Sequence, residues 1–556
     1  MENQRPLLVM ALLLVSAILY IKWIEFTAPP VEQVISVQNG TAVPSANLDP
    51  TAVPSTPTNN VAGTTPVLAD NATPAAEELI TVSTDLMVVN INTFGGVIQL
   101  LETVKESVSI EEPEQGFPLL KKQGNELFVA EDGLLVANQT APSHTQTQYQ
   151  AQQLNYELGA TDAISVPLTW ASENGVEYTK TYTFYKGSYV IDINYQVTNR
   201  SSESWNGYLY AQFSRTEPQN IKSGFGQLPS FSGAAIYTEE EKYEKISFDT
   251  IKDENLKLTT DNAWVAMLQH YFVAAWIPGK GTEKELYTGF SNTAYPSYRV
   301  GYKTLQPVIV GANQTGNLST KAYIGSKEQK LLKAAQKDLD VDGLALTVDY
   351  GFLTFLADPL FVALSAIHSV VQNWGWAIII LTFFIKLLFY PLSAASFRSM
   401  AKMRKIQPRM KTLKERYKDD RQKFQMEMMA MYKKEKINPA GGCLPILVQM
   451  PVFIALYWML LESVEMRHAP FALWLQDLSA PDPYFVLPIL MGLSMWAQQK
   501  LNPAPLDDIQ KKVMMIMPIA LTFLFITFPQ GLVLYWVVNN VLTMAQQWLI
   551  YRQQES

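Results

Sequence analysis

The chain has 556 residues, of which 48% are hydrophobic and 11% aromatic, and its formal net charge is −8. A single cysteine excludes an intramolecular disulfide framework, and the four scattered histidines include no pair at metal-ligand spacing. The charge is uneven: residues 25–350 carry −16 and residues 351–556 carry +7, which predicts that these two parts face different compartments.

An apolar run, LLVMALLLVSAILYI (residues 7–21), follows Arg5 near the N-terminus. A cleaved secretory signal is one interpretation, but the KWIEFTAPP that follows is a poor cleavage site. We therefore favour an uncleaved signal-anchor helix over residues 1–26, close to the length needed to cross a bilayer. Residues 27–79 are rich in Pro, Thr and Ala with few aromatic residues, so we expect a disordered tether there.

From about residue 80 the apolar residues recur at every second position. In VEYTKTYTFY (residues 176–185), valine, tyrosine and phenylalanine alternate with threonine, and the alternation resumes after a turn at Gly187. This pattern indicates a β-hairpin with one buried face. Similar runs on both sides predict a large antiparallel β-sandwich over residues 80–340, which ends in a surface helix at residues 326–339.

The remaining chain, from residue 341, is apolar and helical. Residues 341–373 are expected to connect to the membrane through an interfacial amphipathic helix, interrupted at Asp358-Pro359; a full membrane span is the alternative. Five stronger apolar segments follow, with tryptophan or tyrosine near their ends, at residues 374–392, 443–461, 484–499, 513–528 and 531–551.

Loop charges predict the orientation of these segments. Residues 393–437 contain fourteen basic residues (Lys and Arg) and five acidic residues (Asp and Glu). Residues 462–483 contain one basic residue and four acidic residues. The positive-inside rule places the first loop in the cytoplasm and the second outside. The predicted fold is therefore a polytopic α-helical membrane protein with six transmembrane helices. Five of them form a core over residues 374–556, both termini are cytoplasmic, and the β-sandwich lies outside.

Lys386 lies inside the apolar stretch TFFIKLLFYP (residues 382–391), where a charge is costly. On a helix it shares one face with Thr382 and Gly375. A long lysine stem can snorkel to the interface, so position alone leaves two interpretations open. Other expected helices also carry polar residues in apolar surroundings: Gln449, Thr522, Tyr535, Asn539, Thr543 and Gln546. No carboxylate lies within these segments, which favours a polar cavity with one available cation.

Residues 393–437 predict a basic, methionine-rich helical hairpin. Pro408 is expected to kink its first helix, and Asp419-Asp420 make the turn and can cap the second. Its apolar stripe comprises Met403, Ile406, Met410, Leu413, Tyr417, Phe424, Met428 and Met431. Ordinary packing between the two helices and an adaptable surface for apolar segments both remain open. The basic residues suit anionic lipid head groups or ribosomal RNA.

Motifs for common enzyme chemistry are missing from the sequence. There is no glycine-rich phosphate loop, no HExxH, no GxSxG and no Cys/His pair. We therefore expect no enzyme, no cofactor and no metal, and the remaining classes are a non-enzymatic membrane device or a transporter.

Three motifs in the helical part resemble the bacterial YidC family of membrane protein insertases, in the Gram-negative form that has a large periplasmic domain. They are NPAGGCLPILVQMPVF (438–453), FALWLQDLSAPDPYFVLPILMG (471–492) and FPQGLVLYWVVNNV (528–541). The resemblance implies a five-helix core around a hydrophilic groove with one positive charge. It also implies insertion and folding of proteins at the bacterial inner membrane, alone or with the Sec translocon.

The resemblance also implies roles for individual residues. Lys386 matches the functional basic residue, usually arginine in Gram-negative members, and Thr382 matches an essential threonine. Tyr535 and Trp536 match an aromatic pair whose second member is usually tyrosine, so a hydroxyl is lost there. Met450 and Phe453 match an apolar slide for substrate helices, and we add Gln449 and Asn539 to the groove.

The implied partners are nascent membrane proteins, the Sec translocon with its accessory subunits, a transiently bound ribosome and membrane lipids, but no DNA. A secondary transporter with Lys386 as an anion site is the main alternative, although the sequence shows no inverted repeat. A carbohydrate-binding module on a passive membrane anchor is another, but it leaves the polar helix faces and the basic hairpin unexplained.

Overall fold

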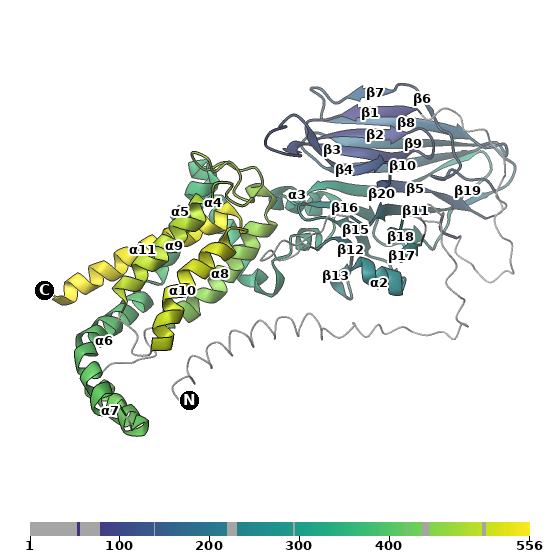
Figure 1. Ribbon diagram of the computed structural model, residues 1–556. Coiled ribbons are helices and arrows are strands. Elements are labelled where there is room, and N and C mark those ends of the chain that lie inside the picture. Colours follow the sequence, from purple (N-terminus) through teal and green to yellow (C-terminus); the bar gives the residue numbers. More distant parts are fainter. Residues whose placement is uncertain are drawn as a thin grey trace.

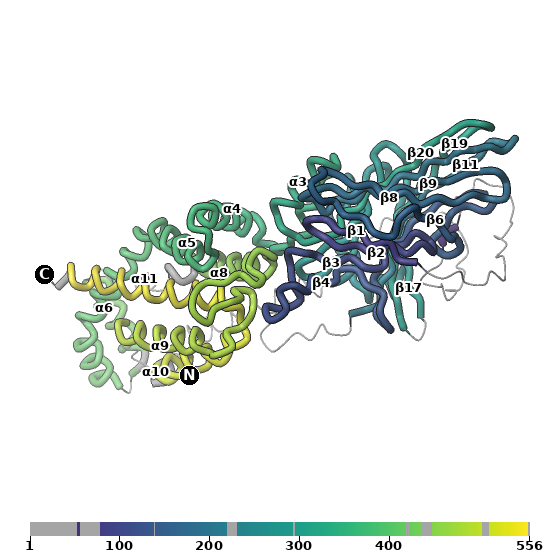
Figure 2. The backbone as a smooth tube through the Cα atoms, turned by 90° about the horizontal axis from the view of Figure 1, so that it is seen from above, coloured from purple at the N-terminus to yellow at the C-terminus, as the bar shows by residue number. Residues whose placement is uncertain are grey.

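The computed structural model describes residues 53–55, 78–137, 139–218, 231–292, 295–418, 420–435, 444–502 and 508–555. The expected anchor over residues 1–26, nearly all of the expected tether over 27–79, and Asp419 lie outside these ranges. The described chain forms a β-rich part and a helical part side by side, with α3 (Gln329–Leu339) between them in both views (Figures 1 and 2). This helix confirms the one expected at residues 326–339.

The first of two large sheets has eleven strands in the described part of the chain. Its order is β14-β17-β18-β11-β5-β4-β3-β2-β1-β7, with β19 also paired to β11, and only β1 and β7 pair in parallel. Its strands are β1 (Leu79–Ser83), β2 (Met87–Asn92), β3 (Val97–Ser107), β4 (Gly116–Gln123), β5 (Glu126–Val136), β7 (Asn155–Glu157), β11 (Trp205–Thr216), β14 (Lys257–Thr260), β17 (Lys284–Ser291), β18 (Ser297–Thr304) and β19 (Val308–Val310).

The second sheet has nine strands within the described ranges, in the order β13-β12-β15-β16-β20-β10-β9-β8-β6, and all its pairs are antiparallel. The two sheets confirm the predicted β-sandwich. The strands are β6 (Gln150–Ala151), β8 (Ala163–Ala171), β9 (Val176–Tyr185), β10 (Val190–Asn199), β12 (Gly233–Thr238), β13 (Lys242–Ile246), β15 (Ala263–Leu268), β16 (Phe272–Pro278) and β20 (Gln314–Ser326).

The predicted hairpin is β9 and β10, with Ile191 paired to Phe184 and Gly187 in the left-handed region at the turn. Alternate residues of β9 are buried, as the period of two requires. One of them is Lys180, whose Nζ donates to Asp132 Oδ1 at 2.9 Å and to the Gly96 carbonyl at 2.8 Å. The strand pattern therefore places an ion pair in the core of the sandwich, where each charge is satisfied by the other.

The helical part of the described chain consists of α4 to α11 with the short 3₁₀ helix η5, and η2 and η3 precede α4. Four of the five expected apolar segments each correspond to one helix, α8 to α11, whereas residues 374–392 are divided between α5 and the start of α6. The bounds are η2 (Leu344–Thr347), η3 (Gly351–Leu353), α4 (Thr354–Val371), α5 (Trp374–Leu388), α6 (Tyr390–Arg416), α7 (Arg421–Lys434), α8 (Leu444–Glu462), η5 (Val464–Met466), α9 (Val486–Leu501), α10 (Asp508–Phe525) and α11 (Gln530–Glu555); α2 (Phe248–Asp253) belongs to the sandwich.

Among the described residues, one helical stretch, Gly351–Val371, has both the length and the composition needed to cross a membrane. The pair α5 and α6 passes the same test only as one span bent by 67°, since α5 alone is about 22 Å long at ~1.5 Å per residue. Val448–Glu462 is a shorter apolar helix. The six membrane spans and the interfacial position of residues 352–371 therefore stay predictions.

The expected interruption at Asp358-Pro359 is wrong, because α4 continues through Pro359. Proline removes one backbone hydrogen bond, but α4 buries Ala357, Phe361 and Leu364 on its inner face, and this packing keeps the helix continuous. Pro408 likewise lies inside the continuous helix α6, so the kink expected there stays a prediction. A sharp bend separates α5 from α6.

The two parts share one hydrophobic core, which runs from the sandwich through α3 and α4 into the bundle. Polar contacts reinforce this junction. The Gln329 N–H donates to Glu465 Oε1 at 3.1 Å, and Arg467 Nη2 donates to the Val108 carbonyl at 3.1 Å. Ser107 Oγ lies 3.1 Å from His468 Nδ1. The segment after α8 is thus bonded to β3 and to the start of α3.

Glu465 makes this junction sensitive to pH. Burial raises the pKa of Glu465 to about 7, and its Oε2 is buried with no hydrogen-bond partner in the described part of the chain. The folded protein favours the neutral carboxyl, so Glu465 lowers the free energy of unfolding above pH 7. This effect fades as the pH falls from about 7 towards the ordinary value of 4.5.

We therefore expect Glu465→Gln to raise the thermal midpoint of unfolding by a few degrees at about pH 8, because glutamine keeps an acceptor for Gln329 without the buried charge. The gain should disappear near about pH 4.5. The measurement is thermal unfolding of the full chain in lipid nanodiscs across this pH range. Glu112→Gln, which changes an exposed carboxylate, is the matched control. A midpoint below that of wild type at every pH would contradict the assignment.

Candidate functional site

The site is centred on Lys386, in the C-terminal half of α5. Its side chain is 3% exposed, and Nζ donates to Thr543 Oγ1 on α11 at 2.8 Å. Phe383 and Leu387 of the same helix are 52% and 57% exposed, so the apolar face of α5 points outward. The ammonium therefore lies between helices, whereas a snorkelling lysine would extend it to water.

Thr543 is oriented to receive this charge. Its hydroxyl donates to the Asn539 carbonyl at 2.5 Å, so the oxygen lone pairs are left for the Lys386 ammonium. No carboxylate forms an ion pair with Lys386 among the residues that the structure describes. Within these residues, the Lys386 ammonium has three N–H donors and one hydrogen-bond partner, the Thr543 hydroxyl.

Other polar side chains continue this contact along α11. Asn540 Nδ2 donates to Ser494 Oγ on α9 at 2.9 Å, and Gln547 Nε2 donates to Asn502 Oδ1 at 3.1 Å. Lys386, Ser494, Asn540, Thr543 and Gln547 are all less than 10% exposed, and we call them the polar seam. The seam holds α11 to both α5 and α9 through hydrogen bonds that apolar packing cannot supply.

The sequence identified the polar face of α11 only approximately. Asn539 and Gln546 are half-buried, and Gln546 Oε1 is buried with no partner in the described ranges. Thr543, which the sequence did identify, makes one interhelical bond, and the others come from Asn540 and Gln547. The spacing of three and four between these residues is the signal that was available. Asn539 contributes its backbone carbonyl to the site.

The other residues that the sequence places on the same face of α5 are Thr382 and Gly375. Thr382 is 1% exposed, and its hydroxyl donates to the Ile378 carbonyl of the same helix at 2.6 Å. A Cβ on Gly375 would meet Phe471 Cδ2 at 2.1 Å, so this glycine permits close packing against the loop after η5. Gly375 is thus a packing residue, and the polar face of α5 consists of Thr382 and Lys386.

The predicted aromatic residues form a second cluster. Trp536 lies edge-on to Phe453 of α8 at 4.5 Å between ring centroids, and its ring is 5.1 Å from Phe525 of α10. Tyr535 is 5% exposed and stacks on Phe453 at 6.4 Å. The indole of Trp536 therefore bridges two helices, a packing role that needs no hydroxyl. Met450 is 38% exposed.

Two groups of predicted residues lie apart from Lys386. Gln449 is half-buried on α8, and no contact joins it to the polar seam in the described part of the structure. The hairpin of α6 and α7 packs Ile406 and Met410 against Met403, Met428, Met431 and Tyr432. Asp420 caps α7 by accepting the Lys423 N–H at 3.0 Å, as predicted, whereas Asp419 is not described.

Comparison with known proteins identifies the family. Residues 79–363 match the family model described as YidC periplasmic domain, and residues 366–556 match the 60Kd inner membrane protein model. The chain is 45% identical over 565 residues to the membrane protein insertase YidC of Nitrosococcus oceani, with 100% of this chain and 99% of that protein covered. The chain belongs to the YidC family of membrane protein insertases. The β-sandwich is therefore its periplasmic domain, and the family is one of inner membrane proteins.

Two further relatives span most of the chain. The YidC insertase of Methylobacillus flagellatus is 49% identical over 481 residues, which cover 86% of this chain and 84% of that protein. A solved structure described as "Active YidC insertase crystal structure with the first transmembrane domain resolved" covers 85% of this chain and 92% of its own, at 18% identity and a TM-score of 0.39.

The polar seam makes a testable prediction at Thr543. Thr543→Val leaves the buried Lys386 ammonium without its hydroxyl partner, so we expect a loss of about 1–3 kcal/mol in the free energy of unfolding. Thr543→Ser keeps the hydroxyl, so this variant should keep most of the free energy of unfolding that Thr543→Val loses. The measurement is thermal unfolding in lipid nanodiscs. Thr522→Val is the matched control, because the Thr522 hydroxyl donates to the Pro518 carbonyl of its own helix. Equal losses in the two valine variants would contradict the role of Thr543.

Proposed function

We propose that this chain inserts and folds integral membrane proteins in the bacterial inner membrane by binding the polar part of a nascent substrate at Lys386. The observation that carries the proposal is a buried cation, Lys386, whose hydrogen-bond partner among the described residues is the single hydroxyl of Thr543. An ammonium has three N–H donors, and we propose that the other two bind the substrate. A buried charge with so little local compensation is costly, which favours a functional role over a structural one.

In the proposed topology, the N-terminal anchor and five core helices cross the membrane, with both termini in the cytoplasm. The supporting observations are the basic hairpin at residues 393–437 and the acidic loop at residues 462–483. The polar seam would form the wall of a hydrophilic groove. Its side chains lie in the membrane part of the bundle, where polar groups facing lipid would be unfavourable.

The proposed driving forces are electrostatic and hydrophobic. An acidic group about 4 Å from Lys386 gains about 4 kcal/mol at an effective dielectric near 20, before desolvation. The membrane potential, positive outside, favours outward transfer of each negative charge by about 2.3 kcal/mol per 100 mV. The apolar part of the substrate gains about 0.3–0.6 kcal/mol per central Leu, Ile, Phe or Val on entering lipid. We infer no covalent step, no cofactor and no nucleotide.

A path for the apolar segment runs beside α8. Met450 and Val448 are 38% and 37% exposed on this helix, and Phe453 lies a turn further along, next to Tyr535 and Trp536. Methionine adapts its shape to varied partners, so this face suits substrate helices of different sequence. We propose it as the apolar slide.

The hairpin is the proposed first contact for substrates and the ribosome. Met426 and Met429 of α7 are 66% and 49% exposed, beside many exposed lysines and arginines. This combination suits apolar segments together with anionic lipid or ribosomal RNA, and we propose no DNA partner. The Sec translocon with its accessory subunits is a further proposed partner, for substrates that this chain does not insert alone.

Variants of Lys386 test the proposal directly. In liposomes that hold the purified protein and a membrane potential, a single-span substrate with an acidic outward tail should insert at about the wild-type rate with Lys386→Arg. We expect about a tenfold loss with Lys386→Ala, and a larger loss with Lys386→Glu, which repels the tail. A substrate with a basic tail should show the smallest effect of Lys386→Glu.

Lys500→Ala is the control, because it removes an exposed cation on α9 that stacks over Trp496. Its insertion rate should match wild type. Equal rates for wild type, Lys386→Ala and Lys386→Glu on every substrate, with all proteins folded, would show that the charge has no part in insertion. Solute flux without insertion would favour the transporter.

A further inference from the structure

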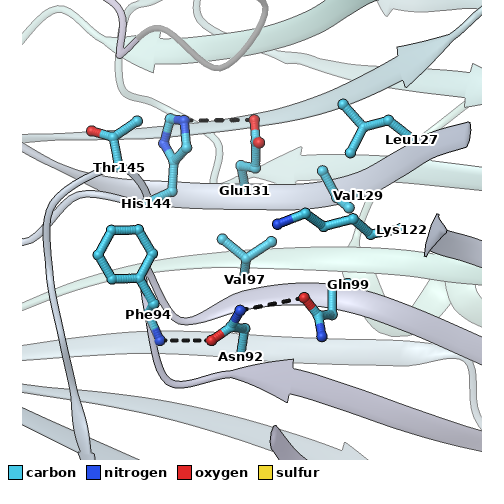
Figure 3. Close-up of a pocket in the computed structure, with 10 residues that line it drawn as sticks. All are labelled: Asn92, Phe94, Val97, Gln99, Lys122, Leu127, Val129, Glu131, His144 and Thr145. Atoms are coloured by element: carbon cyan, nitrogen blue, oxygen red, sulfur yellow. Dashed lines mark hydrogen bonds and ion pairs between the residues drawn. The ribbon is translucent and has the colours of Figure 1, made fainter. Parts of the chain in front are cut away.

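The periplasmic β-sandwich contains a hollow of about 250 Å³ to which the proposed insertion mechanism assigns no role. It lies over four neighbouring strands of the eleven-stranded sheet, β5, β4, β3 and β2, and is closed by residues 144–145 (Figure 3). Its lining residues are Asn92, Phe94, Val97, Gln99, Lys122, Leu127, Val129, Glu131, His144 and Thr145. Alternate residues of β3 and β5 face it, as expected for one face of a sheet.

One wall is a chain of buried polar groups. His144 Nδ1 lies 2.7 Å from the Tyr210 hydroxyl, and His144 Nε2 lies 3.7 Å from Glu131 Oε2. The same carboxylate oxygen accepts hydrogen bonds from Gln212 Nε2 at 2.8 Å and Ser214 Oγ at 2.6 Å. The Oε2 atom of Glu131 thus already accepts two hydrogen bonds, whereas its Oε1 atom accepts none from the described residues. This wall thus presents the Glu131 Oε1 atom, held in a fixed position, and the His144 imidazole to the hollow.

The opposite wall in Figure 3 carries two carboxamides. Asn92 Nδ2 donates to Gln99 Oε1 at 3.3 Å, and Asn92 Oδ1 accepts the Phe94 N–H at 2.9 Å. These bonds fix both amide planes and leave Gln99 Nε2 as a donor with no partner in the described ranges. The Phe94 ring lies beside this pair, and Lys122 is exposed at the rim.

We propose that this hollow binds one ring of a neutral, hydroxyl-rich ligand, that is, a saccharide unit. Recognition by charge would be weak here, because the Lys122 ammonium is solvated and the Oε2 atom of Glu131 already accepts hydrogen bonds from two neutral donors. A hydroxyl group donates and accepts at once, so adjacent hydroxyls can use Glu131 Oε1 and Gln99 Nε2 together. Phe94 offers an apolar surface to the C–H face of the ring, and the volume suits a single ring.

The test uses the full chain in phospholipid nanodiscs prepared without sugar-headed detergents, which would occupy the hollow. Saturation-transfer difference NMR is recorded with glucose, galactose, N-acetylglucosamine and their disaccharides. We expect transfer to at least one of them, with a Kd of roughly 1–10 mM. Gln99→Ala and Phe94→Ala should each weaken binding at least about fivefold. Gln150→Ala, which changes an exposed glutamine of the other sheet, should leave it unchanged.

Three results would overturn the proposal. One is no transfer to any of these sugars at about 10 mM. Another is transfer that persists unchanged in both Gln99→Ala and Phe94→Ala. The last is stronger transfer to the zwitterion glycylglycine that both variants abolish, which would assign the hollow to charged ligands. Insertion is measured on the same samples, so a failed sugar test leaves the proposed function to its own assay.

Discussion

An ammonium group inside an apolar helix bundle must find its hydrogen-bond partners within the protein. Lys386 meets this constraint through Thr543, which lies 157 residues further along the chain. The contact fixes how α5 and α11 sit against each other, and Asn540 and Gln547 extend the same arrangement to α9 and the residue after it. The lysine ammonium is a compact charge that one acceptor can position, whereas the planar guanidinium of an arginine would need several acceptors in its plane. The hydroxyl of Thr543 therefore positions the charge through a single hydrogen bond.

The periplasmic part follows a similar rule. The ion pair of Lys180 and Asp132 lies in the middle of the sandwich, where the hydroxyl of Tyr195 also donates to the carboxylate. At the junction with the bundle, Glu465 is buried with weaker compensation. The buried charges of the sandwich core are thus paired with each other, whereas the stability of the junction depends on the protonation state of Glu465. The stability of the junction therefore depends on pH through Glu465.

The sequence predicted what depends on local periodicity. The alternation in β9 and β10, the helices that cover the five apolar segments, and the Asp420 cap of the hairpin follow from neighbouring residues. Lys180 shows the limit: its position in the alternation places it inside, but only Asp132 from a distant strand explains how it is tolerated. The site shows the same limit. Lys386 and Thr543 were both recognisable as polar residues in apolar segments, but the contact between them results from helix packing. The interruption at Pro359 was wrong because tertiary packing outweighs one lost hydrogen bond.

The bend of 67° between α5 and α6 joins the helix that carries Lys386 to the first arm of the hairpin. With 27 residues, α6 is a rod of about 40 Å, and in Figure 1 it extends from the end of the bundle far from the sandwich. A rod of this length acts as a lever. A tilt of about 10° at the bend would correspond to roughly 7 Å at the far end of α6, so the angle between α5 and α6 determines where the tip of the hairpin lies.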